Sequence, residues 1–232
     1  MKAFLMAGGL GERLRPITDR MPKCLVPIRG VPLLGIWLDL LAREGVDEAL
    51  VNVSRFPELV EAFLDSRAAR HPVVRLVRER SPAGSAGTVA AHRAFVDGEE
   101  SFWIVYADNL TNASLSRLLA AHRANDGVAT LALFRTPSPR SSGIVGIEPD
   151  GRIVRFREKP DHPEGNLANA GIYLARQAIF DWIPAGQGVT DFGHDVFPRM
   201  VGRMYGYEVD GYLIDIGTPE RLEQANADWP GF

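Results

Sequence analysis

Short apolar runs alternate along the chain with longer segments in which apolar residues recur every three to four positions. The runs are rich in β-branched and aromatic residues, which predicts strands at residues 2–7, 49–54, 73–77, 102–107 and 128–135. The segments between them predict helices at residues 33–44, 57–66, 84–96 and 114–124. This alternation is typical of a parallel sheet with helices on both faces. The sequence therefore predicts a Rossmann-like three-layer α/β fold with a mostly parallel central sheet.

The pattern changes after residue 135. Two short strands, at residues 144–148 and 153–156, flank the turn signal Pro149-Asp150-Gly151, which predicts an inserted antiparallel hairpin. The elements expected after it are a strand at 168–174, helices at 177–183, 191–201 and 219–227, and a closing hairpin formed by residues 205–209 and 212–214. No internal repeat or linker interrupts the chain, so we expect a single domain over residues 1–232.

Composition and charge narrow the function classes. The chain has 46% hydrophobic and 24% charged residues, as in an ordinary globular protein, and its net charge of −3 gives no reason to expect nucleic acid or an acidic membrane as a partner. The first apolar stretch, about five residues long, is too short for a signal-peptide core or a membrane span. The single cysteine, Cys24, excludes an intramolecular disulfide and fits a reducing compartment. We expect a cytoplasmic protein.

The loop after the first strand carries the most informative chemistry. It reads GGLGERLRPITDRMPKCLVP, and its glycines Gly8, Gly9 and Gly11 allow backbone N–H groups to approach an anion closely. Arg13 and Lys23 add positive charge. The third glycine and the acidic residue of a dinucleotide fingerprint are missing, and no P-loop Gly-Lys-Ser/Thr follows. A glycine-rich turn with a solvated basic face is the plain alternative.

Two aspartates follow predicted strands. Asp108 comes after FWIVYA, and Asp215 comes after YLI and before a helix opened by proline. Open α/β sheets bind ligands at the carboxyl ends of their strands, and carboxylates are ligands that Mg²⁺ prefers. Each aspartate could instead cap the helix that follows it, although Thr218 competes with Asp215 for that role.

These motifs, in this order, resemble those of the sugar-1-phosphate nucleotidyltransferases. GGLGERLRPIT and PKCLVP are similar to the family's glycine-arginine loop and its Pro-Lys segment, and the likeness runs over nearly the whole chain. It implies that the loop binds the nucleotide phosphates, that Arg13 contacts the leaving pyrophosphate, and that Lys23 contacts the α-phosphoryl group or the sugar phosphate. The loop positions that the resemblance assigns to the nucleotide are Ala7, Gly8, Gly9 and Gly11.

The resemblance also assigns the acidic positions. YLIDIGTPERL matches the family's closing motif, so Asp215 would bind Mg²⁺ together with Asp108, which would also contact the nucleotide. Mg²⁺ is therefore the expected cofactor. Ala107 stands where the family usually has glycine, a departure that would crowd the backbone near the metal.

The segment RERSPAGSAGTV resembles the family's base-reading segment, in which Gly84 would let the backbone lie close to the base. Glu79 is the informative residue, because a carboxylate only accepts hydrogen bonds and can take both N1–H and the exocyclic amino group of guanine. Guanine is therefore favoured. The alternative is that Glu79 is one charge in a solvated Arg-Glu-Arg run.

Three strings in the second half, SGIV, FREKP and NAGIY, resemble the family's sugar-binding motifs. By that likeness Gly143, Glu158 and Asn169 would contact sugar hydroxyls, and Lys159 would hold the sugar phosphate. Residues of about 1–135 would then form the nucleotide-binding half and about 136–232 the sugar-binding half. Exposed strand-end charges are the alternative for Glu158 and Lys159.

The resemblance implies an enzyme that transfers a nucleoside monophosphate from an NTP, with GTP favoured, to a mannose- or heptose-type sugar 1-phosphate. The sugar phosphate would attack in line with Mg²⁺ assistance, giving a nucleotide sugar and pyrophosphate. Thymidylyl or uridylyl transfer to a hexose 1-phosphate is the alternative within this class. A regulatory subunit that binds a nucleotide sugar without turning it over is the alternative from another class. The length suggests a minimal single-domain member, and the oligomeric state, a homo-oligomer included, is left open.

Overall fold

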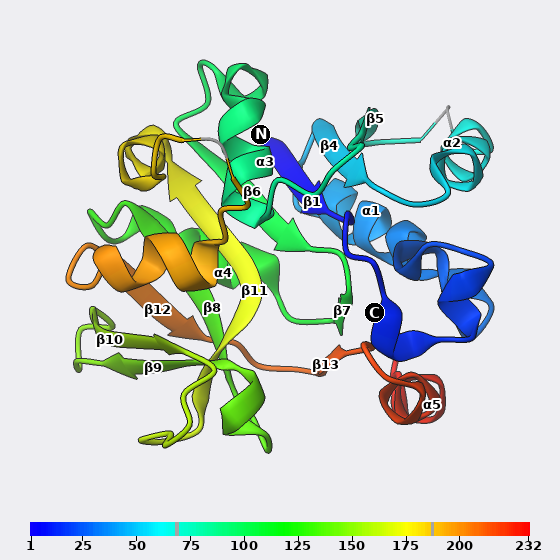
Figure 1. Cartoon of the computed structure of the whole chain (residues 1–232). Helices are drawn as coiled ribbons and strands as arrows, with labels where there is room; N and C mark the ends of the chain where they lie inside the picture. Colours follow the sequence, from blue (N-terminus) through cyan, green and yellow to red (C-terminus); the bar gives the residue numbers. More distant parts are fainter. Residues whose placement is uncertain (68–69, 187) are drawn as a thin grey trace. The chain divides into compact units, whose positions relative to one another are not determined.

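The computed structural model describes residues 1–67, 70–186 and 188–232, and Figure 1 shows the course of the chain. The chain forms two compact units that interleave along the sequence. The first consists of Met1–Pro82, Val105–Ala113 and Gly211–Phe232. The second consists of Ala83–Ile104 and Ser114–Asp210. The assignment of nucleotide and sugar to an N-terminal and a C-terminal half of one domain stays a prediction.

The first unit contains a parallel sheet with the strand order β1-β4-β5 (Figure 1). Its strands are β1 (Lys2–Met6), β4 (Glu48–Val53) and β5 (Val73–Arg78). Helix α1 (Leu33–Arg43) lies in the connection from β1 to β4, and α2 (Pro57–Asp65) in the connection from β4 to β5. Five consecutive residues of β4 are buried, as expected for a parallel strand covered on both faces.

The long loop after β1 is ordered by short local structures. Three single-turn 3₁₀ helices follow one another, η1 (Glu12–Leu14), η2 (Ile17–Asp19) and η3 (Lys23–Leu25). A short hairpin of β2 (Pro27–Ile28) and β3 (Val31–Pro32) then leads into α1. The loop is therefore a series of tight turns rather than an irregular segment.

A second, very small sheet in the first unit joins distant parts of the sequence. Strand β7 (Asn109–Thr111) pairs antiparallel with β13 (Leu213–Asp215), with Asp215 opposite Asn109. Helix α5 (Pro219–Asp228) follows β13. The indole of Trp37, in α1, anchors the pair by donating from Nε1 to the carbonyl oxygen of Asn109 at 2.6 Å. This pairing brings the chain around Asp108 next to the chain around Asp215.

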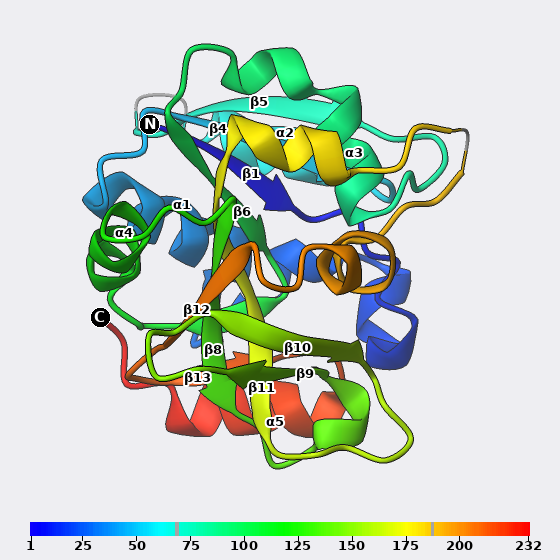
Figure 2. The same cartoon turned by 90° about the vertical axis from the view of Figure 1, so that its left-hand side faces the viewer.

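Antiparallel pairing dominates the second unit (Figure 2). Strand β10 pairs with β9, β9 with β11, and β11 with β8, all antiparallel, and β12 pairs with β8 in parallel. The strands are β8 (Ala129–Arg135), β9 (Gly143–Ile147), β10 (Ile153–Glu158), β11 (Leu167–Arg176) and β12 (Met204–Glu208). The unit also contains helices α3 (Ser85–Ala91) and α4 (Leu115–Arg123). The β9–β10 hairpin predicted around Pro149-Asp150-Gly151 is confirmed.

The predicted closing hairpin is wrong. Its two strands do not pair with each other, because β12 lies along β8 and β13 lies along β7. The amide of Val209 donates to the carbonyl of Leu133 at 2.8 Å, which continues the β12–β8 ladder up to the turn. The pair Asp210-Gly211 permits a tight turn. Which strands then pair is decided by β7 and β8, which lie far from this turn in the sequence.

Two of the predicted helices are not α-helical. Residues 191–201 form a π-helical turn, η7 (Phe192–Val196), followed by the 3₁₀ turn η8 (Phe197–Arg199), and residues 177–183 form the 3₁₀ helix η6 (Gln177–Trp182). Pro198 explains the first difference, because proline has no N–H to donate and its ring displaces the carbonyl one turn earlier.

The predicted fold class is confirmed, since the chain is mixed α/β and strand β6 (Ser101–Tyr106) belongs with β1, β4 and β5 to a mostly parallel central sheet. Within the described residues, no helix combines the length and the apolar character needed to cross a membrane.

Candidate active site

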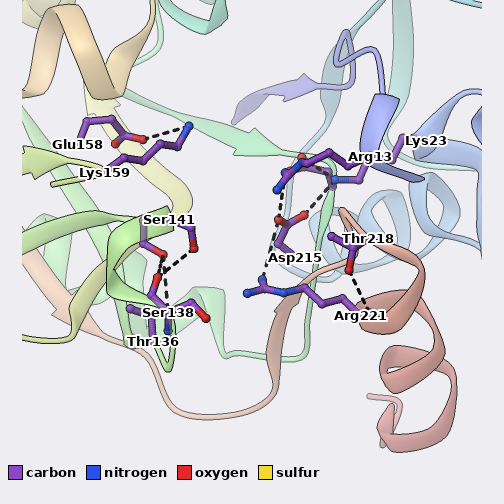
Figure 3. Close-up of polar contacts among 12 residues, drawn as sticks. Arg13, Lys23, Thr136, Ser138, Ser141, Glu158, Lys159, Asp215, Thr218 and Arg221 are labelled. Atoms are coloured by element: carbon purple, nitrogen blue, oxygen red, sulfur yellow. Dashed lines mark hydrogen bonds and ion pairs between the residues drawn. The ribbon is translucent and has the colours of Figure 1, made fainter. Parts of the chain in front are cut away.

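Lys23 lies between the two aspartates predicted to bind metal. Its Nζ donates to Asp108 Oδ2 and to Asp215 Oδ1, in each case at 2.9 Å (Figure 3 shows the bond to Asp215). The two carboxylate oxygens are therefore no farther apart than about twice that distance. Both aspartates and the lysine belong to the first unit. The structure thus brings together three side chains that the sequence places far apart.

The local fold explains this convergence. Lys23 opens the 3₁₀ turn η3 directly after Pro22, which aims its side chain inward. The amide of Ile216 donates to the carbonyl of Asp108 at 3.1 Å and extends the β7–β13 pairing by one step. Only 7% of Lys23 is exposed. Burial by itself would lower the pKa of Lys23, but the charges of Asp108 and Asp215 outweigh it and the pKa is raised.

Asp215 collects two further cations. On its Oδ2 side lie an Arg13 nitrogen at 3.9 Å and an Arg221 nitrogen at 4.0 Å (Figure 3). Arg221 was not predicted to belong to the site, because nothing in its local sequence distinguishes it from a surface residue of the last helix. Asp215 is not the cap of that helix, since Thr218 Oγ1 accepts from the Arg221 amide at 3.4 Å.

Gly217 makes room for this group of charges. A Cβ at this position would lie 2.9 Å and 3.0 Å from the two Asp215 carboxylate oxygens and 3.0 Å from an Arg13 nitrogen. A side chain there would displace one partner or the other. The glycine in the string DIGTPE therefore has a physical reason that the motif alone does not reveal.

The glycine loop is fixed at its first and last glycines. Gly11 has φ +65°, and a Cβ there would lie 2.9 Å from Thr18 Cγ2. A Cβ at Gly8 would lie 2.6 Å from Asn52 Nδ2 and 3.3 Å from Glu79 Oε2. Nothing lies within 4 Å of the corresponding point at Gly9. Gly8 and Gly11 are thus required by their surroundings, whereas the role of Gly9 depends on the resemblance alone.

Two polar residues at the end of β4 hold the start of the loop. Asn52 Oδ1 accepts from the Ala7 amide at 2.8 Å, and Ser54 Oγ donates to the Gly8 carbonyl at 2.9 Å. Neither residue was predicted. The available signal was the asparagine inside the otherwise apolar strand sequence ALVNV, since a polar residue buried in a strand has a hydrogen-bonding role.

The donor set fits Mg²⁺ bound together with a phosphorylated ligand. Among the described residues, no group of three or more His, Cys, Asp and Glu could hold a metal ion. Asp108 and Asp215 nevertheless supply two carboxylates side by side, and Mg²⁺ is commonly held by one or two carboxylates while phosphates and water complete its shell. Asp108 and Asp215 would therefore hold the ion only with a ligand that brings oxygens of its own.

The second unit brings together the four residues predicted to bind sugar, Gly143, Glu158, Lys159 and Asn169. Gly143 of β9 lies opposite Glu158 of β10, and Lys159 Nζ is 3.7 Å from Glu158 Oε1 (Figure 3). A Cβ at Gly143 would lie 2.6 Å from Glu158 Oε2, and a Cβ at Gly193 would also lie 2.6 Å from it. Glu158 is thus confined between two glycines, of which Gly193 was not predicted. Burial raises the pKa of Glu158, and the charges of Lys159 and His194 offset part of that rise.

Asn169 lies on the other side of Gly143, with its Cβ 3.5 Å from the point that a Gly143 Cβ would take. Its amide is engaged within β11, since Oδ1 accepts from the Gly171 amide at 3.0 Å and Nδ2 donates to the Tyr173 hydroxyl at 2.8 Å. These bonds hold the irregularity in the β11–β8 register.

Gly84 has a packing reason of its own. With φ +81°, it lies against the backbone of Thr190, whose carbonyl accepts from the amides of Ala86 and Gly87 at 3.0 Å and 3.1 Å. A Cβ at Gly84 would collide with that carbonyl. Nucleotide binding by Gly84 stays a prediction.

A polar pocket of about 430 Å³ opens beside Glu158 in the second unit. Gly193 and His194 of the π-helical turn line it, together with His162 and Arg157. His194 is exposed at the pocket, where the π-helical turn η7 places it.

Taken together, the fold and the site define a class of protein. An α/β chain with a glycine loop, a buried lysine between two carboxylates, two further arginines and a polar pocket is suited to binding phosphorylated ligands. The comparisons with known proteins make the assignment specific. The model of the family described as "Nucleotidyl transferase" matches residues 2–230, and the chain belongs to this family.

Curated relatives support the assignment. The chain is 33% identical over 230 residues to a mannose-1-phosphate guanylyltransferase of Mycobacterium tuberculosis, with 97% of this chain and 64% of the relative covered. It is 32% identical over 225 residues to the mannose-1-phosphate guanylyltransferase catalytic subunit beta of Danio rerio, with 95% and 62% covered. The chain thus spans less than two thirds of the length of these relatives.

Solved structures share the fold. A Bacillus anthracis protein assigned to the glucose-1-phosphate thymidylyltransferases, solved with sucrose, superposes with a TM-score of 0.86 at 23% identity, covering 98% of this chain and 94% of that one. HddC from Yersinia pseudotuberculosis superposes with a TM-score of 0.81 at 22% identity, covering 98% and 99%. A complex of HddC with GMP-PN gives 0.78 at the same identity, covering 98% and 99%.

Proposed function

We propose that the protein transfers a guanylyl group from GTP to a mannose- or heptose-type sugar 1-phosphate, releasing pyrophosphate. The observation that carries the proposal is the position of Lys23 between Asp108 and Asp215, with Arg13 and Arg221 beside Asp215. Transfer at a nucleotide phosphorus is catalysed almost entirely by positioning and by neutralising charge on oxygens, and this group supplies both.

In this proposal the cations of the chain carry the catalytic work. Lys23 exchanges its carboxylate partners for oxygens of the α-phosphoryl group or of the attacking sugar phosphate, and holds them in line. Arg13, whose side chain is 72% exposed, is free to follow the departing pyrophosphate. No covalent enzyme intermediate is needed, because the attacking phosphate oxygen is already an anion.

Asp108 and Asp215 would hold Mg²⁺ together with the phosphates. When bound, the ion would neutralise charge on the phosphate oxygens. Asp215 also keeps Arg13 and Arg221 near the loop, so it has a second role through this chain's own residues.

The assignment of the base and the assignment of the sugar depend on different observations. Guanine is supported by the acceptor chemistry of Glu79 and by the names of the curated relatives, which are guanylyltransferases. Mannose is supported by those names alone. Glu158, Lys159, Asn169 and Gly143 are the residues we assign to the sugar 1-phosphate. Because nucleoside triphosphates are the substrates, and the lone cysteine suits a reducing compartment, we place the activity in the cytoplasm.

The direct test is pyrophosphate release from a panel of GTP, ATP, UTP and dTTP against mannose, heptose and glucose 1-phosphates. We expect the highest kcat/KM with GTP and mannose or heptose 1-phosphate. Release only with UTP or dTTP would overturn the assignment of the base. Binding of nucleotide sugar without any release would instead support a non-catalytic subunit.

Site variants test the mechanism separately from the substrate. Asp108→Asn and Lys23→Ala should each lower kcat/KM about 100-fold or more, while circular dichroism shows a folded chain. Lys2→Ala is the matched control, since Lys2 is a partly exposed cation of the same unit that pairs with Glu48 at 3.7 Å. Near wild-type turnover by either site variant would remove that residue from the mechanism.

A further inference from the structure

A buried side-chain amide, that of Asn52, lies near the end of strand β4. Asn52 is 4% exposed, yet both ends of its side-chain amide have partners on different elements. Oδ1 accepts from the Ala7 amide at 2.8 Å, and Nδ2 donates to Glu79 Oε2 at 3.1 Å. Asn52 therefore connects the start of the glycine loop with the carboxylate to which we assign the base.

The chemistry of these partners fixes the orientation of the amide. The Ala7 amide can only donate, so it must face Oδ1, and the carboxylate of Glu79 can only accept, so it must face Nδ2. Turning the amide by 180° would place donor against donor and acceptor against acceptor. An asparagine satisfies both partners in one orientation only.

The backbone of Glu79 is held as well. Its amide donates at 2.8 Å to the carbonyl of Val53, the residue that follows Asn52 in the sequence. With the backbone fixed by Val53 and one carboxylate oxygen fixed by Asn52, the side chain has little freedom left. A carboxylate has about four acceptor sites, and the bond from Asn52 uses one of them.

We propose that Asn52 is a positioning residue for base selection, which orients the Glu79 carboxylate so that it accepts from both N1–H and the 2-amino group of guanine. The proposal rests on the proposed guanylyltransferase function. Two parallel acceptors can match two donors only if the plane of the carboxylate is set, because hydrogen bonds weaken steeply away from linear geometry. Glu79 makes the contact, and Asn52 sets its angle.

The test compares GTP with ITP, which retains N1–H but lacks the 2-amino group. Asn52→Asp is the sharpest variant, because it preserves the shape and the acceptor for the Ala7 amide while placing a carboxylate oxygen against Glu79. We expect the ratio of kcat/KM for GTP over ITP to fall at least tenfold, mainly through a higher KM for GTP. Ser54→Ala is the matched control, because Ser54 holds Gly8 from the same strand end without a bond to Glu79. It should change both substrates alike and leave the ratio intact.

The double variant Asn52→Asp with Glu79→Gln separates selection from stability. The amide introduced by Glu79→Gln can donate to the new carboxylate, so the melting temperature should recover towards that of the wild type. The GTP preference should stay lost, because an amide side chain in place of the Glu79 carboxylate no longer offers two acceptor oxygens. If Asn52→Asp fails to fold, Asn52→Ser removes the amide donor without adding a charge and takes its place in the comparison.

The outcomes distinguish the two levels of the proposal. If Glu79→Gln abolishes the preference for GTP and Asn52→Asp preserves it, Glu79 reads the base without Asn52 and the inference about Asn52 is wrong. If Glu79→Gln itself leaves the preference unchanged, the assignment of the base to Glu79 fails and the inference falls with it. A loss of preference in both single variants, with an unchanged ratio in Ser54→Ala, supports the inference.

Discussion

Lys23→Met tests whether the Lys23 ammonium stabilises the pair of carboxylates formed by Asp108 and Asp215. Methionine keeps the length and the apolar stem of the lysine but removes the ammonium that lies 2.9 Å from both Asp108 and Asp215. At that distance each pair is worth about 6 kcal/mol with an effective dielectric constant of about 20. Much of this gain is offset, since the ammonium is buried and the side chains of Asp108 and Asp215 are 43% and 32% exposed and remain partly hydrated. We estimate a net loss of about 2–4 kcal/mol.

For a chain of this size, that loss corresponds to a melting temperature lower by about 5–15 °C. The matched control is Lys2→Met, which removes a partly exposed cation of the same unit whose Glu48 partner lies 3.7 Å away. Its effect on the free energy of unfolding should stay within about 0.5 kcal/mol. Differential scanning fluorimetry of both variants gives the comparison directly.

Added divalent cation should separate the two variants further. In the wild-type chain Lys23 must leave both carboxylates before an ion can bind between them, so Mn²⁺ binding without nucleotide should be weak. Lys23→Met lacks this competitor, so we expect Mn²⁺ to bind about tenfold more tightly or better, and millimolar Mg²⁺ to recover part of the lost melting temperature. Electron paramagnetic resonance of free Mn²⁺ measures the affinity without any turnover. Equal Mn²⁺ affinity in wild type and variant, with a melting temperature matching that of Lys2→Met, would refute the reasoning.

Three further predictions follow from other parts of the chain. Gly193→Ala should displace the Glu158 carboxylate, because a Cβ at position 193 would lie 2.6 Å from Glu158 Oε2. In steady-state kinetics we expect the KM for the sugar 1-phosphate to rise about tenfold or more, while the KM for the nucleotide stays nearly unchanged. Burial lowers the pKa of His122 to about 4, so below about pH 6.5 the unfolded chain binds a proton that the folded chain does not. The free energy of unfolding should therefore fall as the pH drops below about 6.5 and level off near pH 4, with a total loss of about 3 kcal/mol. Urea titrations of wild type and His122→Gln across this range check it, and equal slopes in the two proteins would exclude His122 as the cause. Cys24 should resist Ellman's reagent at pH 8 until the chain unfolds, because it is 2% exposed and burial raises the pKa of its thiol to about 12; fast labelling under native conditions would contradict this.

The fold was predictable from sequence where neighbouring residues decide the outcome. The βα alternation and the turn at Pro149-Asp150-Gly151 each contain their own signal, and both are confirmed. The closing hairpin failed because strand pairing at Asp210-Gly211 depends on β7 and β8, far away in the sequence. A three-residue strand such as β7 is too short to show an alternating pattern, so its partner could not be read locally.

The site divides in a similar way. Arg13, Lys23, Asp108 and Asp215 stand in motifs with a definite order, so resemblance could select them, although their roles stay predictions. Arg221 carries no such signal, because an arginine in the first turn of an exposed helix is ordinary. Its place beside Asp215 follows from the β7–β13 pairing and the cap at Thr218, which together aim the first turn of α5 at the carboxylate.

The charges around Asp215 suggest how the free site stays ready for an anion. Lys23, Arg13 and Arg221 face two carboxylates, so these five side chains carry an excess of one positive charge. Three cations this close would repel one another, and Asp215 holds them together by lying at the centre of the group. An arriving phosphate offers the same cations more negative charge and more acceptor oxygens than a single carboxylate does. The cations can therefore turn from Asp215 to the phosphate over a short distance, and Asp215 serves as a stand-in for the ligand while the site is free.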